Sequence, residues 1–208
     1  MHRGAVLPPL ERMNRQMSNR NALRKLSRKF PAPPEVEKIM DSLREGTDLS
    51  IAITATAILE AILERLLIKK FKIKNKRLTG QIFLNRGPLS EFNSKILIAN
   101  AFGIITSNMA EEMHSLKAIR NTFAHAKVPI SFNHELIGRE VASLKMLKAS
   151  RAVDDEIGHY LELDNKNWFL LVTKFILIIF SDLEEHPGSA DEAIAEALAE
   201  EQPPASPY

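Results

Sequence analysis

The sequence predicts an all-α protein with a single helical bundle of about six helices. Apolar residues recur at helical spacing in segment after segment, and no strand pattern of convincing length is present. Prolines, glycines and capping residues separate these segments. With 208 residues and 45% hydrophobic residues, the chain is long and apolar enough to bury one substantial core. Helices packed on helices are therefore the expected architecture.

Charge divides the chain into three parts. Residues 1–34 hold eight lysines and arginines against one acid, whereas residues 181–208 hold eight acids and no cation. We expect a basic disordered arm over 1–34, a helical domain over 35–186 and an acidic disordered tail over 187–208.

Two helices open the domain. The first runs over 34–43, begins at a proline and stops before Gly46. The second begins at Asp48 or Ser50, either of which can cap it, and runs to about Lys70. It is apolar on most sides, so we expect it to be the central helix of the core.

Six lysines and arginines follow closely, over residues 69–77. Cations at a helix C-terminus complement the helix dipole, which is the simplest interpretation, and a contact with nucleic acid is the alternative. A connector through Gly80 then leads to Gly87 and Pro88.

The next two helices run over 91–102 and from about 108 to 124. Ser90 can cap the first, and Gly103 suits a left-handed stop at its end. Asn108 and Glu111 resemble a capping box for the second.

The last two helices run over 134–148 and 164–185, with an acidic stretch between them. The most apolar run, over 168–180, is 13 residues long and carries Lys174, so it is too short and too polar to cross a membrane. We expect a buried helix there and no membrane contact.

The helix over 108–124 carries the sequence Arg120-Asn121-Thr122-Phe123-Ala124-His125 near its end. A guanidinium binds phosphate through a rigid fork of donors, and histidine exchanges protons near neutral pH. This suggests metal-independent RNA cleavage, with His125 as the base, Arg120 on the phosphate and Asn121 orienting the imidazole. The competing interpretations are a solvated helix end and a buried His125 that braces it.

Helix geometry adds a condition to the catalytic interpretation. His114, Ala118, Asn121 and His125 share a face opposite the apolar one, and we expect this face to point outward. Arg120 lies about 140° from His125 around an uninterrupted helix. The two side chains therefore need a helix break or a second subunit to meet, which favours a homodimer.

Three segments resemble the mannitol operon repressor (MltR) family: Thr56 to Glu64, Gly87-Pro88-Leu89-Ser90-Glu91-Phe92-Asn93-Ser94-Lys95-Ile96 with Ala101 to Ile105, and Ile119 to His125. This resemblance implies an all-helical bacterial cytoplasmic protein that represses transcription and has no enzyme activity. The last segment is also similar to the Arg-Asn-x-x-x-His motif of HEPN-domain proteins. That similarity implies a dimeric endoribonuclease with Arg120, Asn121 and His125 as its active residues.

A repressor needs a DNA-binding element, and two segments are candidates. Residues 94–113 have the spacing of a helix-turn-helix, but Glu111 and Glu112 would repel phosphate, so an αα-hairpin is favoured. The basic arm can instead follow a phosphate backbone without sequence preference, through Arg15, Arg20, Arg24, Lys25, Arg28 and Lys29.

Other chemistry is not indicated. Glu60 and Glu64 lie one turn apart but lack a Glu-x-x-His repeat, so a solvated edge or charge partners for Arg65 or Lys69 are favoured over a metal site. No cofactor motif or metal spacing is present, and the absence of cysteine fits the cytoplasm.

We therefore expect a cytoplasmic transcriptional regulator that acts through protein association, as a homodimer with a further protein partner. A HEPN-type endoribonuclease is the alternative, and an interaction module without nucleic acid is the third possibility.

Overall fold

The computed structural model describes residues 33–84, 86–145 and 164–185, with a few residues between 19 and 26. The chain divides into two compact units, Met1–Pro31 and Ala32–Tyr208, and every helix discussed below belongs to the second. The described part of the chain contains helices and no strand, which confirms the all-α fold. The predicted acidic tail and nearly all of the predicted basic arm lie outside the described residues.

The described helices are somewhat more numerous than the six expected. They are α2 (Pro33–Leu43), α3 (Asp48–Lys70), α4 (Lys76–Phe83), α5 (Phe92–Ala101), α6 (Ser107–His125), α7 (Glu135–Ser143) and α9 (Asn165–Glu185). The additional helix is α4, in a region where the sequence suggested only a connector. The Oδ1 atom of Asn75 caps α4 by accepting from the backbone N–H groups of Arg77 and Leu78, and buried Phe83 anchors its end.

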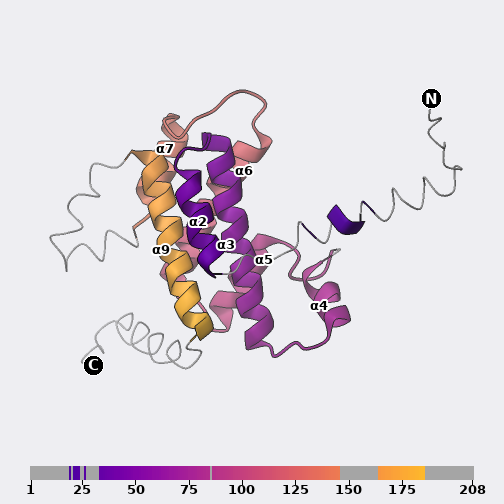
Figure 1. The fold of residues 1–208 in the computed structure, drawn as a ribbon. Coiled ribbons are helices and arrows are strands. Elements are labelled where there is room, and N and C mark those ends of the chain that lie inside the picture. The colour runs from indigo at the N-terminus through magenta and orange to yellow at the C-terminus, as the bar shows by residue number, and fades with distance from the viewer. Residues whose placement is uncertain are drawn as a thin grey trace, which may run out of the picture. The chain divides into compact units, whose positions relative to one another are not determined.

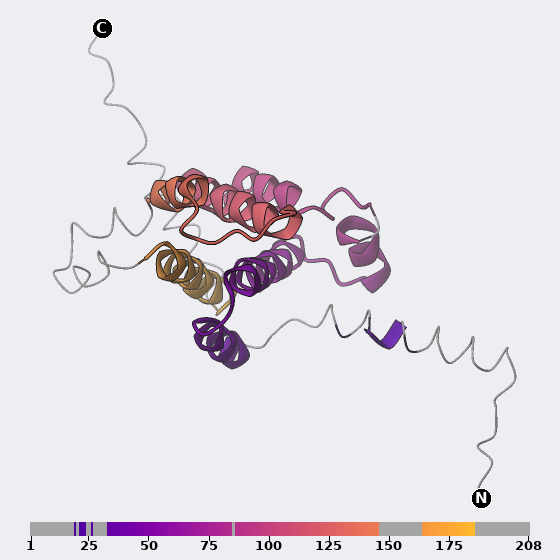
Figure 2. The same ribbon diagram turned by 90° about the horizontal axis from the view of Figure 1, so that it is seen from above.

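Helix α3 lies at the centre of the bundle, as its sequence predicts. It contacts α2, α5, α6 and α9, and it contributes ten buried residues to the core. Viewed from above, α3 and α9 form a middle layer between α2 on one side and α5 with α6 on the other (Figure 2).

Contacts at the two helix ends show the direction of α9 relative to α3. Lys166 Nζ donates to the carbonyl oxygen of Gly46 at 3.2 Å, and Arg65 near the other end of α3 pairs with Glu184. Helices α3 and α9 therefore run parallel, side by side (Figure 1).

Helix ends are set by residues close to those predicted. Thr47, rather than Asp48 or Ser50, caps α3, and Thr106, rather than Asn108, caps α6. Asp48 instead accepts from the backbone N–H of Phe132 at 2.9 Å. The left-handed helix stop predicted at Gly103 is confirmed, because its φ is 62°. The N–H of Ile104 donates to the Ala99 carbonyl at 2.8 Å, as in a Schellman motif.

Gly87 lies where the chain turns back against α4. The N–H of Leu89 donates to the Ile82 carbonyl at 2.9 Å. A Cβ atom at position 87 would come within 2.3 Å of the carbonyl oxygens of both Gln81 and Ile82. The close approach of these backbone segments accounts for a glycine here.

We predict that Gly87→Ala destabilises the protein by roughly 1–3 kcal/mol, since the added methyl group must displace backbone rather than a flexible side chain. Gly80→Ala is the matched control: it lies inside α4 with open space around its Cβ, and should stabilise by up to about 1 kcal/mol. Urea unfolding of both variants measures this difference. Equal stability of the two variants would contradict the packing argument.

Candidate functional site

Helix α6 holds the Arg120 to His125 motif against the core through aromatic contacts. Phe123 is buried, and its ring centroid lies 4.9 Å from that of Phe132, which lies 5.1 Å from Phe169 of α9. The rings fix the last turns of α6, so the side chains on its other faces occupy defined positions.

Arg120 binds two neighbours. Its Nη2 atom lies 3.2 Å from Oε2 of Glu60 on α3, and its Nη1 atom donates to Oδ1 of Asn121 at 2.8 Å. The Arg120 side chain is 27% exposed. Its guanidinium is therefore paired with a carboxylate, which would repel an approaching phosphate.

A second cation joins the same carboxylate. Lys95 of α5 is only 3% exposed, and its Nζ atom lies 2.8 Å from Oε1 of Glu60 and 2.7 Å from Oε2 of Glu64. Glu60, Glu64, Lys95 and Arg120 form what we call the ion-pair cluster. It contains two acids and two cations, so its charges balance, and it links α3, α5 and α6.

The sequence suggested that Glu60 and Glu64 form a solvated edge or pair with Arg65 or Lys69, and the structure shows neither arrangement. The two acids are not a solvated edge, and their partners are Lys95 and Arg120, whereas Arg65 and Lys69 contact Glu184. Within the described ranges, no group of three potential metal ligands occurs.

His125 lies apart from Arg120. Helix α6 continues without a break to His125, so the two side chains lie on different faces of one helix. His125 is exposed and is therefore not a buried brace. Asn121 binds Arg120 through Oδ1, so this atom does not orient the imidazole in the described arrangement. Of the three predicted catalytic residues, Arg120 contacts Asn121, whereas His125 shares a helix face with Asn121 but lies apart from Arg120.

Lys95 is the member of the cluster that sequence reasoning missed. The spacing of α5 could have indicated that Lys95 is buried, because Lys95 falls on the same helix face as the buried residues Phe92, Ile96 and Ala99. A lysine at a core position predicts a buried acidic partner.

The three segments that resemble the MltR family meet at this cluster. Glu60 and Glu64 belong to the first, Lys95 to the second and Arg120 to the third. Helix packing therefore brings the three segments together through these ion pairs.

Two other sequence predictions concern nucleic acid. Residues 94–113 form an αα-hairpin, since α5 packs on α6 and Lys117 Nζ donates to Asn93 Oδ1 at 2.6 Å. In the second helix Glu112 is buried and accepts from the backbone N–H of Lys145. The predicted contacts of the basic arm, Arg15, Arg20, Arg24, Lys25, Arg28 and Lys29, lie outside the described residues.

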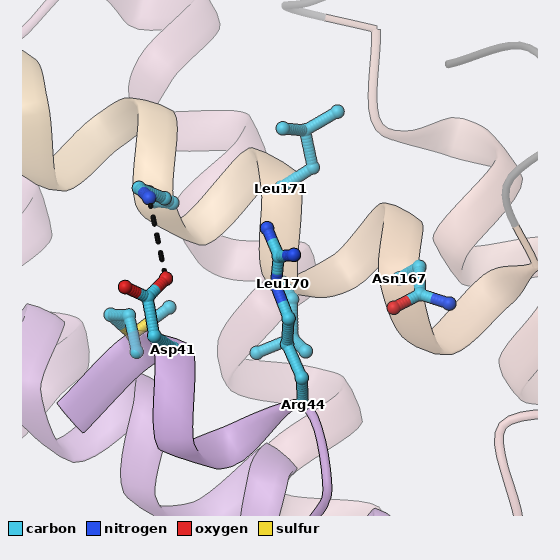
Figure 3. Close-up of a pocket in the computed structure, with 7 residues that line it drawn as sticks. Asp41, Arg44, Asn167, Leu170 and Leu171 are labelled. Atoms are coloured by element: carbon cyan, nitrogen blue, oxygen red, sulfur yellow. Dashed lines mark ion pairs between the residues drawn. The ribbon is translucent and has the colours of Figure 1, made fainter. Parts of the chain in front are cut away.

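A pocket of about 340 Å³ lies between α2 and α9, away from the motif (Figure 3). Its polar lining consists of Asp41, Arg44, Asn167 and Lys174. Lys174 Nζ lies 3.6 Å from Asp41 Oδ1, so one of its two cations is already paired. A pocket of about 550 Å³ lies where α6 begins, near the end of α7. Neither pocket includes the motif.

Comparison of the chain with models of protein families, with curated proteins and with solved structures gives no match. In the part of the chain that the structure describes, no helix is both long and apolar enough to cross a membrane.

We predict that Lys95→Met destabilises the protein by about 3 kcal/mol, because it leaves Glu60 and Glu64 close together without their shared cation. Methionine keeps most of the side-chain volume, so the loss of stability would come from the missing charge rather than from a cavity. The double variant Lys95→Met/Glu64→Gln should recover part of the loss, as measured by urea unfolding. Unchanged stability of Lys95→Met would show that the cluster contributes little.

His114 gives the protein a predicted pH dependence. Burial, and secondly the nearby Lys117 charge, lower the pKa of His114 below its usual 6.5. As the pH falls below 6.5, the unfolded chain gains a proton that the folded chain does not, so acid favours unfolding. His114→Gln should therefore lose less stability than the unaltered protein between about pH 7.5 and about pH 5.5 in urea titrations. An identical loss in both proteins would rule out this role of His114.

Proposed function

We propose that this protein is a non-catalytic helical regulator of transcription of the mannitol operon repressor type, which acts through protein association as a homodimer. The observation that carries this proposal is the pairing of Arg120 with Glu60 at 3.2 Å. A nuclease of the HEPN type needs this arginine for phosphate, but here it belongs to a balanced ion-pair cluster. The motif is then part of the scaffold on which association surfaces are built.

One association surface lies on α3. Leu49 and Ile53 are 48% and 37% exposed, one helical turn apart, and exposed Ala57 continues the row toward Glu60. A two-fold interface joins the same patch on both copies, so a straight apolar row on one helix can pack against its own copy. We assign the homodimer contact to Leu49, Ile53 and Ala57, called the α3 row below.

One observation favours the endoribonuclease as a second candidate. His125 is exposed at the end of α6, on the same face as the partly exposed Asn121. A base in this position is accessible to RNA, and a second copy would have to supply the phosphate-binding cation. This candidate thus requires a dimer in which the two α6 helices face each other, with Arg120 released from Glu60.

We predict that the full chain is a dimer in solution and that Ile53→Glu makes it monomeric but leaves each monomer folded, because Ile53 is exposed. Sedimentation velocity measures the change. Ile178→Glu on α9 is the matched control, since Ile178 is also an exposed isoleucine, and it should remain a dimer. A monomeric unaltered protein, or equal effects of the two substitutions, would exclude the α3 row as the interface.

We predict that the protein does not cleave RNA, because Arg120 is paired with Glu60. Purified protein, His125→Ala and Arg120→Gln would be incubated with a labelled single-stranded RNA without metal ions. Cleavage by the unaltered protein that is lost in both variants would establish the endoribonuclease and reject the non-catalytic assignment. Equal cleavage by all three would indicate a contaminating nuclease and leave that assignment standing.

A further inference from the structure

Positive charge is concentrated in the segment that ends α3 and begins α4. Residues 65–90 contain eight lysines and arginines and no acidic residue. Lys72, Lys74, Lys76 and Arg77 are all exposed, and together with Phe102 we call them the basic surface. Among the described residues, no ion pair involves these four cations.

The helix dipole accounts for only part of this charge. Lys69 and Lys70 lie in the last turn of α3, where cations are stabilising, and Lys69 also donates to the Glu184 carbonyl. Lys76 and Arg77 lie in the first turn of α4, where the positive end of the dipole disfavours cations. These cations therefore repel one another and also interact unfavourably with the positive end of the α4 dipole. A bound polyanion would offset this repulsion.

An exposed aromatic ring packs against Phe71, which lies within the basic segment over residues 69–77. Phe102 directly follows α5 and is 57% exposed, although its ring centroid lies only 5.3 Å from that of Phe71. The two rings meet edge to face, at 71°. Phe71 lies between Lys70 and Lys72 in the chain, so the contact holds Phe102 next to the basic segment while more than half of Phe102 stays open to solvent.

We propose that the basic surface binds single-stranded nucleic acid. Lys74, Lys76 and Arg77 contact successive phosphates, and Phe102 stacks on an unpaired base, which any base can provide. A duplex keeps its bases stacked inside and cannot use the ring in this way. The surface is separate from the Arg120 motif, and its assignment does not rest on the regulatory function proposed above.

The phosphate contacts are tested with the full chain and fluorescein-labelled oligo(U) and oligo(dT), by fluorescence anisotropy over a range of salt concentrations. Lys74→Gln/Lys76→Gln should weaken binding and reduce the slope of log affinity against log salt by about 1.4, or about 0.7 for each lost contact. Lys38→Gln/Arg44→Gln is the matched control: it removes the same charge from exposed positions at α2 and should leave the slope unchanged. Equal losses in the two double variants would mean that net charge or another segment binds the oligonucleotide, and would overturn the proposal.

The stacking contact is tested by Phe102→Ala, which should weaken oligo(U) binding on the order of tenfold. Leu97→Ala is the matched control, because Leu97 is an equally exposed apolar residue of α5, and it should leave binding unchanged. Phe102→Trp should keep the affinity, which separates stacking from loss of local structure. Circular dichroism confirms that each variant is folded.

Three results would reject the single-stranded assignment. Leu97→Ala as damaging as Phe102→Ala would indicate a general apolar contact. Duplex DNA binding as tightly as oligo(U), with no effect of Phe102→Ala, would indicate a purely electrostatic surface. Binding to phosphatidylserine vesicles without binding to either oligonucleotide would identify a lipid surface as the polyanion.

Discussion

The buried amino group of Lys95 determines how α3, α5 and α6 pack together. Removing an ammonium group from water costs several kcal/mol, so the surrounding helices must supply compensating charge at close range. Glu60 and Glu64 do so from α3, and Glu60 also binds Arg120 of α6. Apolar contacts allow helices to slide by small amounts, whereas this cluster requires one register of α3, α5 and α6. It therefore contributes specificity to a core that apolar burial stabilises.

The two groups of cations in this protein have opposite surroundings. Lys95 and Arg120 are matched by acids and lie close to the core, which is the arrangement expected of a structural role. Lys74, Lys76 and Arg77 are exposed, have no acidic partner among the described residues, and oppose the dipole of α4. Residues that destabilise their own helix and have no compensating partner are expected at functional surfaces. On this basis we propose that Arg120 belongs to the scaffold and that the basic segment over residues 69–77 is the better candidate for nucleic acid.

The fold was predictable because helical periodicity and capping signals act locally. The central position of α3, the stop at Gly103 and the course of α9 all follow from spacing in the sequence. Helix α4 was missed because its eight residues carry a glycine and only a short apolar pattern, and its cap, Asn75, looked like part of a charged connector. The ion-pair cluster was also missed, since its members lie up to 60 residues apart and no local pattern tells which acid a buried lysine meets. Helical spacing predicts an outward face for His125, and this side chain is exposed.

Whether Arg120 depends on Glu60 can be measured as a coupling free energy between the two side chains. A double-mutant cycle with Glu60→Gln, Arg120→Gln and the double variant, measured by urea unfolding, isolates the interaction between the two side chains from their separate contributions. We expect a coupling free energy of about 1 kcal/mol or more, with the double variant less destabilised than the sum of the single variants. Strictly additive losses would contradict it, because Arg120 would then be independent of Glu60 and available for another role.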